Sequence, residues 1–354
     1  MTPFVYESRP GRVVFGAGSL RSVADEVSRL GLSRIVVVSG GELKPLAEQV
    51  AALIGPACVG VHAAAVMHTP VDVTETALAV VERLKADGLV AIGGGSSIGL
   101  AKAIALRTDL PQIAIPTTYA GSEMTPVIGE TRDGAKVTQT DLRVLPEVVI
   151  YDADLTLALP VGISVTSGVN AMAHAVEALY AKDRNPVMDL MAAEGIRALF
   201  GALPAIARRA DDPAARARAQ YGAWMGGMCL AGAGMALHHK LCHTLGGSYG
   251  LPHAETHTVV LPHALAYNAP AVPEAMRALR EATGSDDPAQ AIQDLARAAG
   301  APLSLREIGM EERDIDGAVE RALANPYWNP RPLEAEPLRQ TLRRAFNGEA
   351  PVVP

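Results

Sequence analysis

Residues 89–106, LVAIGGGSSIGLAKAIAL, decide the fold of this chain. Leu89–Ile92 is a short apolar run, typical of a strand that is buried on both faces. Three glycines follow it, and Ser97–Leu106 then reads as a helix. A buried strand, a glycine turn and a helix in direct succession are characteristic of α/β proteins, whose strands run parallel.

The same alternation extends over about the first 150 residues. The further strands that we expect are Arg34–Val38, Gln112–Ile115 and Val148–Tyr151, and the further helices are Pro45–Leu53 and Val73–Lys85. Strands that alternate with helices imply a parallel sheet with right-handed crossovers. We therefore expect a Rossmann-like, dinucleotide-binding α/β domain over residues 1–158, with its ligand at the carboxyl ends of the strands.

The second half of the chain has a different character. From Leu159 onward β-branched runs become rare and alanine-rich helical patterns dominate. The helices that we expect there are Asn185–Leu203, Pro213–Ala233, Asp287–Ala299 and Glu311–Ala324. This predicts an all-helical domain over residues 159–354, and a cleft between the two domains is the default place for a site.

Composition narrows the class of protein. The chain has 354 residues and a net charge of −7, which argues against non-specific binding to nucleic acid. Its three cysteines form no CxxC pair, so we expect free thiols rather than disulfides or a zinc knuckle. The N-terminus lacks the pattern of a signal peptide, and the longest apolar stretch is interrupted by glycines and Lys102. We expect a cytoplasmic protein that does not enter a membrane.

The glycine turn predicts a dinucleotide site. Gly93, Gly94, Gly95 and Ser96 lie between a strand and a helix N-terminus, where unpaired N–H groups and the helix dipole suit a pyrophosphate. The next strand ends in a second polar loop that includes Thr117-Thr118. Each loop alone could be an ordinary tight turn with capping hydroxyls. Both loops on neighbouring strands favour a nucleotide.

The strand Arg34–Val38 bears on the choice of cofactor. An acidic residue at such a strand end typically binds the ribose 2′-hydroxyl and selects NAD. Here Ser39 and Gly40 occupy that place, while Glu42 follows closely. We therefore expect weak discrimination, so that either NADH or NADPH can serve.

Histidines gather in the helical half. Asn170 and His174 are four residues apart, as are His239 and His243, so each pair lies on one helix face. His253 follows ten residues after His243. Imidazoles that converge in this way serve as metal ligands or as acid–base groups, although single helical histidines are often ordinary polar residues. We expect His257 and His263 to be structural.

These segments resemble the iron-containing alcohol dehydrogenases. The resemblance rests on the ordered motifs IGGGSSIGLAKAIA (92–105), PTTYAGSEMTP (116–126), DADLTLALP (152–160), SGVNAMAHAVEALYA (167–181) and HHKLCHTLGGSYGLPHAE (238–255). It implies the dehydroquinate synthase-like fold of that family, a homodimer, and further cofactor contacts at Lys136, Leu155 and Thr156. Within the family the chain is most similar to the maleylacetate reductases, on account of the second motif, Met67-His68, the HHKLCH run and the tail NPYWNPRPLE (325–334).

The resemblance also implies a metal site. The positions that match the iron or zinc ligands are Asn170, His174, His239 and His253, and the amide of Asn170 stands where metal-dependent members carry a carboxylate. Lys240 lies next to one ligand position, and an ammonium repels a dication. A ligand set without a negative charge binds a cation poorly. Our hypothesis is that the metal site is vestigial and that Lys240 and the histidines supply the positive field. Gly99, where those members carry an aspartate, is expected to tune packing or cofactor binding.

The resemblance implies the chemistry as well. Hydride from NADH or NADPH would reduce the alkene of maleylacetate to give 3-oxoadipate, with His243 as the proton donor. The substrate is a small dicarboxylate, which we expect Lys240 and Arg331 to bind while Tyr327 and Trp328 shape the pocket. Arg331 could instead be a surface arginine. Two rival functions are a metal-dependent alcohol dehydrogenase or ketone reductase that uses Asn170 as a neutral ligand, and a non-catalytic nucleotide sensor.

Overall fold

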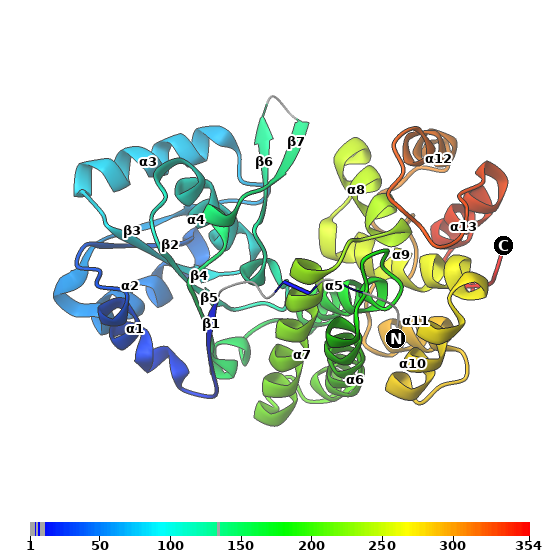
Figure 1. The fold of residues 1–354 in the computed structure, drawn as a ribbon, viewed down its shortest axis with the longest axis horizontal. Coiled ribbons are helices and arrows are strands. Elements are labelled where there is room, and N and C mark those ends of the chain that lie inside the picture. The colour runs from blue at the N-terminus through cyan, green and yellow to red at the C-terminus, as the bar shows by residue number, and fades with distance from the viewer. Residues whose placement is uncertain (1–3, 5, 8–10, 133–134) are drawn as a thin grey trace. The chain divides into compact units, whose positions relative to one another are not determined.

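The computed structural model describes residues 4, 6, 7, 11–132 and 135–354. The chain divides into an α/β unit that ends at Leu159 and a helical unit that begins at Pro160 (Figure 1). This division lies one residue after the end of the domain that composition predicts. An α/β unit followed by a helical unit is the fold class expected from the sequence.

The α/β unit is built on a six-stranded parallel sheet. Its strands are β1 (Arg12–Phe15), β2 (Ile35–Gly40), β3 (Cys58–Ala65), β4 (Gly88–Gly93), β5 (Gln112–Pro116) and β8 (Val148–Tyr151). Their order across the sheet is β1-β8-β5-β4-β2-β3, and the edge strand β1 pairs Arg12 with Val148 of β8. The sequence did not identify β1 or β3. An antiparallel hairpin of β6 (Val127–Arg132) and β7 (Ala135–Thr140) was also not expected.

Helices cover both faces of this sheet. They are α1 (Val23–Arg29), α2 (Lys44–Ile54), α3 (Val71–Leu84) and α4 (Gly95–Thr108). Ile35 and Val37 of β2 belong to a core that α1 and α2 complete, while α4 packs against the sheet through β2, β4 and β5. Because both faces are buried, β2 and β4 read as continuous apolar runs rather than as alternating patterns.

The order of the strands reverses between β2 and β4. From β2 the chain proceeds outward to β3, then returns to β4 on the other side of β2 and continues to β5. Such a switch point opens a crevice at the carboxyl ends of the two strands, where doubly wound proteins bind their ligands. The glycine turn predicted to bind phosphate lies at this place.

The second unit consists of nine named α-helices among the described residues. They are α5 (Val161–Ala178), α6 (Pro186–Arg208), α7 (Pro213–Gly232), α8 (Leu237–Tyr249), α9 (His253–Asn268), α10 (Pro273–Thr283), α11 (Pro288–Ala298), α12 (Asp314–Ala324) and α13 (Ala335–Asn347). Helix α9 packs against both α5 and α8. These three helices therefore bring together the segments that carry the predicted histidines.

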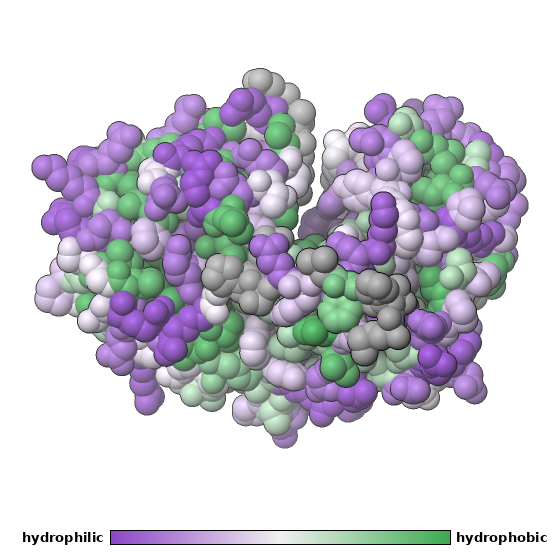
Figure 2. Space-filling view, in the orientation of Figure 1, coloured by the Kyte–Doolittle hydropathy of each residue, from purple (hydrophilic) through white to green (hydrophobic). Residues whose placement is uncertain are grey.

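One helix, α6, is long and apolar enough to cross a membrane by length and composition alone. It packs against α5 and α7, and residues such as Ala192, Ile196 and Leu199 are fully buried. The face of the molecule drawn in Figure 2 intersperses hydrophilic with apolar residues. Helix α6 thus lies within the packing of the helical unit.

Candidate active site

The glycine turn forms an open helix N-terminus in the α/β unit. Strand β4 ends at Gly93, and α4 begins at Gly95 with Gly94 as its N-cap and no hydrogen bond from a capping side chain. Gly93 has a φ of 139°, and a Cβ there would lie 2.3 Å from Ser97 Oγ. Only glycine fits at this position. The first N–H groups of α4 lack partners further back in the helix, which suits them to an anion.

The second predicted loop lies against the first. Thr117 N–H donates to Gly93 O over 3.0 Å, and a Cβ on Gly94 would come within 3.0 Å of Thr118 Cγ2. A Cβ on Gly95 would meet nothing within 4 Å. The turn is thus closed on the side of Thr118 and open at Gly95, which leaves room for a phosphate.

Other predicted cofactor residues have structural roles. Ser39 and Thr156 are fully buried. The hydroxyl of Ser39 donates to Gly40 O, and that of Thr156 donates to Ala153 O. Leu155 packs against the core of the sheet. The two hydroxyls are thus engaged within the chain, and the cofactor contacts expected of these residues stay a prediction. The side chain of Lys136 in β7 lies outside the described residues, and its proposed contact stays a prediction.

Gly99 gives room to a strained loop. A Cβ at Gly99 would lie 2.7 Å from Thr69 Oγ1, and Thr69 itself has a φ of 46°. The neighbouring His68 also has a positive φ, of 65°. Bonds from Thr131 to the carbonyls of His68 and Thr69 hold this loop in place. The glycine at position 99 therefore serves close packing, since a longer side chain would displace Thr69.

Six imidazoles of the helical unit form what we call the histidine cluster. Its members are His174 on α5, His238, His239 and His243 on α8, and His253 and His257 on α9. The ring centroid of His239 lies 5.0 Å from that of His174 and 4.9 Å from that of His257. The rings of His253 and His257 are 4.2 Å apart. The three helices thus bring the predicted His174, His239, His243 and His253 into one region.

A carboxylate supports the cluster from within the protein. Glu177 is fully buried, and its Oε2 lies 2.8 Å from His239 Nδ1. The same side chain accepts hydrogen bonds from the backbone N–H groups of Ala236 and His238, each over 2.8 Å. Glu177 thus satisfies donors at the N-terminus of α8 that would otherwise be buried without partners.

Several polar atoms at the predicted metal site lack partners. Among the described residues, no hydrogen bond reaches Asn170 Oδ1, His174 Nδ1 or His239 Nε2. Burial, reinforced by the neighbouring histidines, lowers the pKa of His174 and of His239 well below the usual 6.5. These rings are therefore neutral near pH 7. The three atoms are neutral acceptors of the kind that bind a metal, but the set carries no charge.

The tightest group of imidazoles differs from the predicted ligand set. The ring nitrogens of His238, His239 and His257 all lie within 4.8 Å of one another, whereas His253 is exposed. Only His239 belongs to both groups. His257, which the sequence assigned to a structural role, lies inside the cluster, and both of its ring nitrogens lack a hydrogen-bond partner among the described residues.

His243 connects the cluster to a second group of side chains, Lys240 and Tyr327. His243 is exposed, and its Nδ1 lies 2.9 Å from the hydroxyl of Tyr327. Lys240 Nζ lies 5.6 Å from the centroid of the Tyr327 ring, a cation–π contact. Burial raises the pKa of Tyr327 and lowers that of Lys240. An ammonium, an imidazole and a phenol thus lie together, and their role in binding the substrate stays a prediction.

Arg331 does not join this group as a free cation. Its guanidinium donates to Tyr267 O over 2.8 Å and to Pro354 O over 3.1 Å, and it stacks 4.4 Å from the Tyr267 ring centroid. These contacts tie the C-terminus to α9. Arg331 is thus held by backbone carbonyls and the Tyr267 ring, and its expected role as a substrate ligand stays a prediction. Trp328, by contrast, is exposed beside Tyr327 in the sequence.

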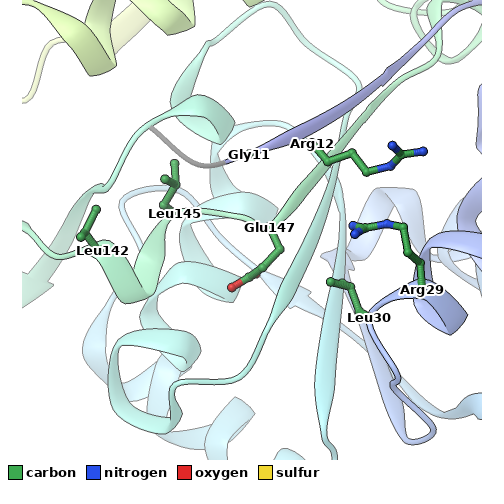
Figure 3. Close-up of a pocket in the computed structure, with 7 residues that line it drawn as sticks. All are labelled: Gly11, Arg12, Arg29, Leu30, Leu142, Leu145 and Glu147. Carbon is green, nitrogen blue, oxygen red and sulfur yellow. The ribbon is translucent and has the colours of Figure 1, made fainter. Parts of the chain in front are cut away.

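The α/β unit also has a surface pocket of about 410 Å³ (Figure 3). It is lined by Gly11, Arg12, Arg29, Leu30, Leu142, Leu145 and Glu147. Arg12 begins β1 and Glu147 directly precedes β8, so the pocket lies at the amino ends of these strands. The glycine turn lies at the opposite, carboxyl edge, and the pocket does not belong to the nucleotide site.

No site role was predicted from the sequence for Glu177, which supports the cluster, or for His257 within it, although a signal existed for both. Glu177 follows His174 by three positions, and His257 follows His253 by four, so each pair shares a helix face. The spacing alone did not distinguish them from ordinary helix residues.

Comparison with known proteins agrees with this geometry. Residues 10–153 match the iron-containing alcohol dehydrogenase family, and residues 164–346 match its C-terminal part. A maleylacetate reductase of Rhizobium sp. strain MTP-10005 is 54% identical over 99% of this chain and its own whole length. The crystal structure of maleylacetate reductase from Agrobacterium tumefaciens is 54% identical, covering 99% of this chain and 100% of that one, with a TM-score of 0.96. An iron-containing alcohol dehydrogenase from Corynebacterium glutamicum is 45% identical, covering 99% and 98%, with a TM-score of 0.94. The chain therefore belongs to the iron-containing alcohol dehydrogenase family, and within it to the maleylacetate reductases.

Proposed function

We propose that the protein reduces the carbon–carbon double bond of maleylacetate to give 3-oxoadipate, with NADH or NADPH as the hydride donor. The observation that carries this proposal is the group of Lys240, His243 and Tyr327 beside the histidine cluster, in a chain 54% identical to a maleylacetate reductase. The open N-terminus of α4 supports a dinucleotide as the cofactor.

The proposed reaction needs one hydride and one proton. Hydride attacks the alkene carbon remote from the keto group, and the electron pair of the double bond moves toward the keto oxygen as an enolate. Lys240 stabilises this developing negative charge. His243 then protonates the carbon next to the keto group, while the Tyr327 hydroxyl, 2.9 Å from His243 Nδ1, fixes the orientation of the ring.

A metal would be held by Asn170 Oδ1, His174 Nδ1 and His239 Nε2, where it would act as a Lewis acid on the keto oxygen. These atoms fit a metal as neutral ligands, but no carboxylate completes the set. We propose that reduction does not depend on such an ion, because Lys240 supplies a positive charge in the same region.

Lys240 is also our proposed ligand for a substrate carboxylate. The homodimer and the cytoplasmic location that the family resemblance and the composition imply are part of the same proposal. Light scattering of the purified protein tests the first of these.

The test is oxidation of NADH in the presence of freshly prepared maleylacetate, with and without EDTA. Rapid turnover that survives EDTA supports the reductase and its independence of metal. Turnover that EDTA abolishes, and that one metal restores, assigns the reaction to Asn170, His174 and His239 as ligands. Failure with maleylacetate but oxidation of simple alcohols would favour a metal-dependent alcohol dehydrogenase. Cofactor binding without turnover of any substrate would favour a nucleotide sensor.

A further inference from the structure

The contacts of Glu177 determine its ionisation. Its Oε1 accepts from the N–H of His238 over 2.8 Å. Its Oε2 accepts from the N–H of Ala236 over 2.8 Å and from that of His239 over 3.4 Å. Backbone N–H groups can only donate, so a proton on Glu177 could point only toward His239 Nδ1. That nitrogen is itself a donor, because it faces the acceptor Nδ1 of His238, whose Nε2 donates to a carbonyl oxygen. Burial raises the pKa of Glu177, but the geometry favours the ionised carboxylate, which accepts from every one of these partners.

An ionised Glu177 determines the proton position on His239. Nδ1 of His239 lies 2.8 Å from Glu177 Oε2, and a carboxylate can only accept. The Nδ1 atom must therefore carry the hydrogen. In the neutral ring Nε2 is then a bare lone pair. This Nε2 is the atom that lacks a partner among the described residues.

His238 is consistent with the same assignment. Its Nε2 lies 3.0 Å from the carbonyl oxygen of His257, so Nε2 must donate and Nδ1 must be the acceptor. His238 Nδ1 faces His239 Nδ1 at 3.2 Å, where it receives the same hydrogen that points to Glu177. Burial lowers the pKa of His238 to about 3, as a neutral ring requires. Because both nitrogens of His238 are engaged in hydrogen bonds, to His257 O and to His239 Nδ1, this ring offers no lone pair to a metal, and the tight group of His238, His239 and His257 is not a metal site.

We propose that Glu177 is a positioning residue that locks His239 in the Nδ1–H tautomer and presents its bare Nε2 as an acceptor. A group that faces Nε2 must then be a hydrogen-bond donor or a cation. Neutral His239 cannot donate to an enolate or a carboxylate. This assigns charge stabilisation to Lys240 and protonation to His243, a consequence that rests on the proposed function.

The first test measures the tautomer directly. Protein labelled with ¹⁵N-histidine is studied by NMR at pH 8, and the His239 signals are assigned by their absence from the His239→Asn spectrum. We expect a protonated Nδ1 and an unprotonated Nε2. A protonated Nε2 in the wild-type protein would overturn the proposal, whatever the outcome of the maleylacetate assay.

The second test is Glu177→Gln, which keeps the shape but turns an NH₂ group toward one of the four donors. We expect a mixture of His239 tautomers and a fall in kcat of about tenfold, the cost of one lost hydrogen bond, because molecules with the wrong tautomer turn an N–H toward the group that must donate to Nε2. The KM for NADH should stay unchanged. The matched control is Asp183→Asn, because Asp183 accepts a hydrogen bond of 2.9 Å from Gly234 N–H shortly before α8. It should leave both the tautomer and kcat as they are. A Glu177→Gln protein with the wild-type tautomer and kcat would refute the role of Glu177.

Discussion

The N-termini of α4 and α8 differ in what lies at the positive end of the helix dipole. At α4 the N-cap is Gly94, no side chain caps the helix, and the space at Gly95 is open. At α8 the N-cap is Ala236, and the buried carboxylate of Glu177 occupies the positive end. The positive end of α4 is thus open to a ligand anion, as we propose for the cofactor, whereas that of α8 is occupied by a carboxylate of the same chain. A helix of the second kind needs a side chain to attract a substrate carboxylate, and α8 carries Lys240.

The largest effect that we expect therefore comes from Lys240→Met. Loss of the ammonium should lower kcat/KM for maleylacetate by about two to three decades, as for a lost oxyanion donor. Affinity for NADH should not change. Lys182→Met, which removes an exposed lysine, is the matched control and should behave as wild type. A kcat/KM for Lys240→Met within a factor of three or so of wild type would remove Lys240 from the mechanism.

The next prediction converts α4 into a helix of the second kind. Gly95→Asp places a carboxylate at the first turn of α4, in space where a Cβ meets nothing within 4 Å. It should weaken NADH binding about 100-fold by repelling the pyrophosphate, while the melting temperature holds or rises. Fluorescence titration with NADH and thermal unfolding measure the two effects. Gly95→Ala should cause a smaller loss. Unchanged NADH affinity in Gly95→Asp would move the phosphate site away from this turn.

A smaller loss should follow from Tyr327→Phe. This change removes the hydroxyl that lies 2.9 Å from His243 Nδ1 but keeps the ring under Lys240. We expect kcat to fall by about tenfold, because His243 keeps its place but loses an orienting hydrogen bond. Steady-state kinetics at saturating NADH would detect this. A comparable rise in the KM for maleylacetate with an unchanged kcat would show that Tyr327 binds the substrate without orienting His243.

These predictions also show which part of the site the sequence could reveal. The conformation of the α4 turn is determined by residues that are adjacent in the chain, so GGGSS (93–97) was enough to predict the glycine turn and the open N–H groups. The α8 terminus depends on Glu177, which comes from another helix, and no local pattern in HHKLCH indicates it. Similarly, β3 was missed because CVGVHAAA is rich in alanine and glycine and acquires its strand structure by pairing with β2. The contacts of Arg331 could not be predicted either, because its partners Tyr267 O and Pro354 O are backbone atoms, and a sequence pattern does not show which backbone atoms lie close together.

The smallest effect that we expect is on the free energy of unfolding at acid pH. It concerns His263, which is not a member of the histidine cluster, and it tests whether a buried imidazole stays neutral in the folded protein. Burial, with a contribution from Arg344, lowers the pKa of His263 on α9 from 6.5 to about 4. Between these values the unfolded chain holds a proton that the folded chain lacks, so the free energy of unfolding falls as pH drops. His263→Leu should remove this slope of about 1.4 kcal/mol per pH unit. Urea unfolding at pH 7, 6 and 5 should give a flatter dependence than wild type, and parallel curves would contradict the assignment.

The pairing of β1 with β8 has a consequence for how the sheet assembles during protein synthesis. Arg12 precedes its partner Val148 by most of the α/β unit, so β1 can take its place in the sheet only after β8 has been made. The sheet therefore stays incomplete until β8 has been made, and the edges of β1 and β5 that pair with β8 stay exposed until then. Once Tyr151 has been made, all six strands of the sheet are present, while the helices of the second unit are still to be translated.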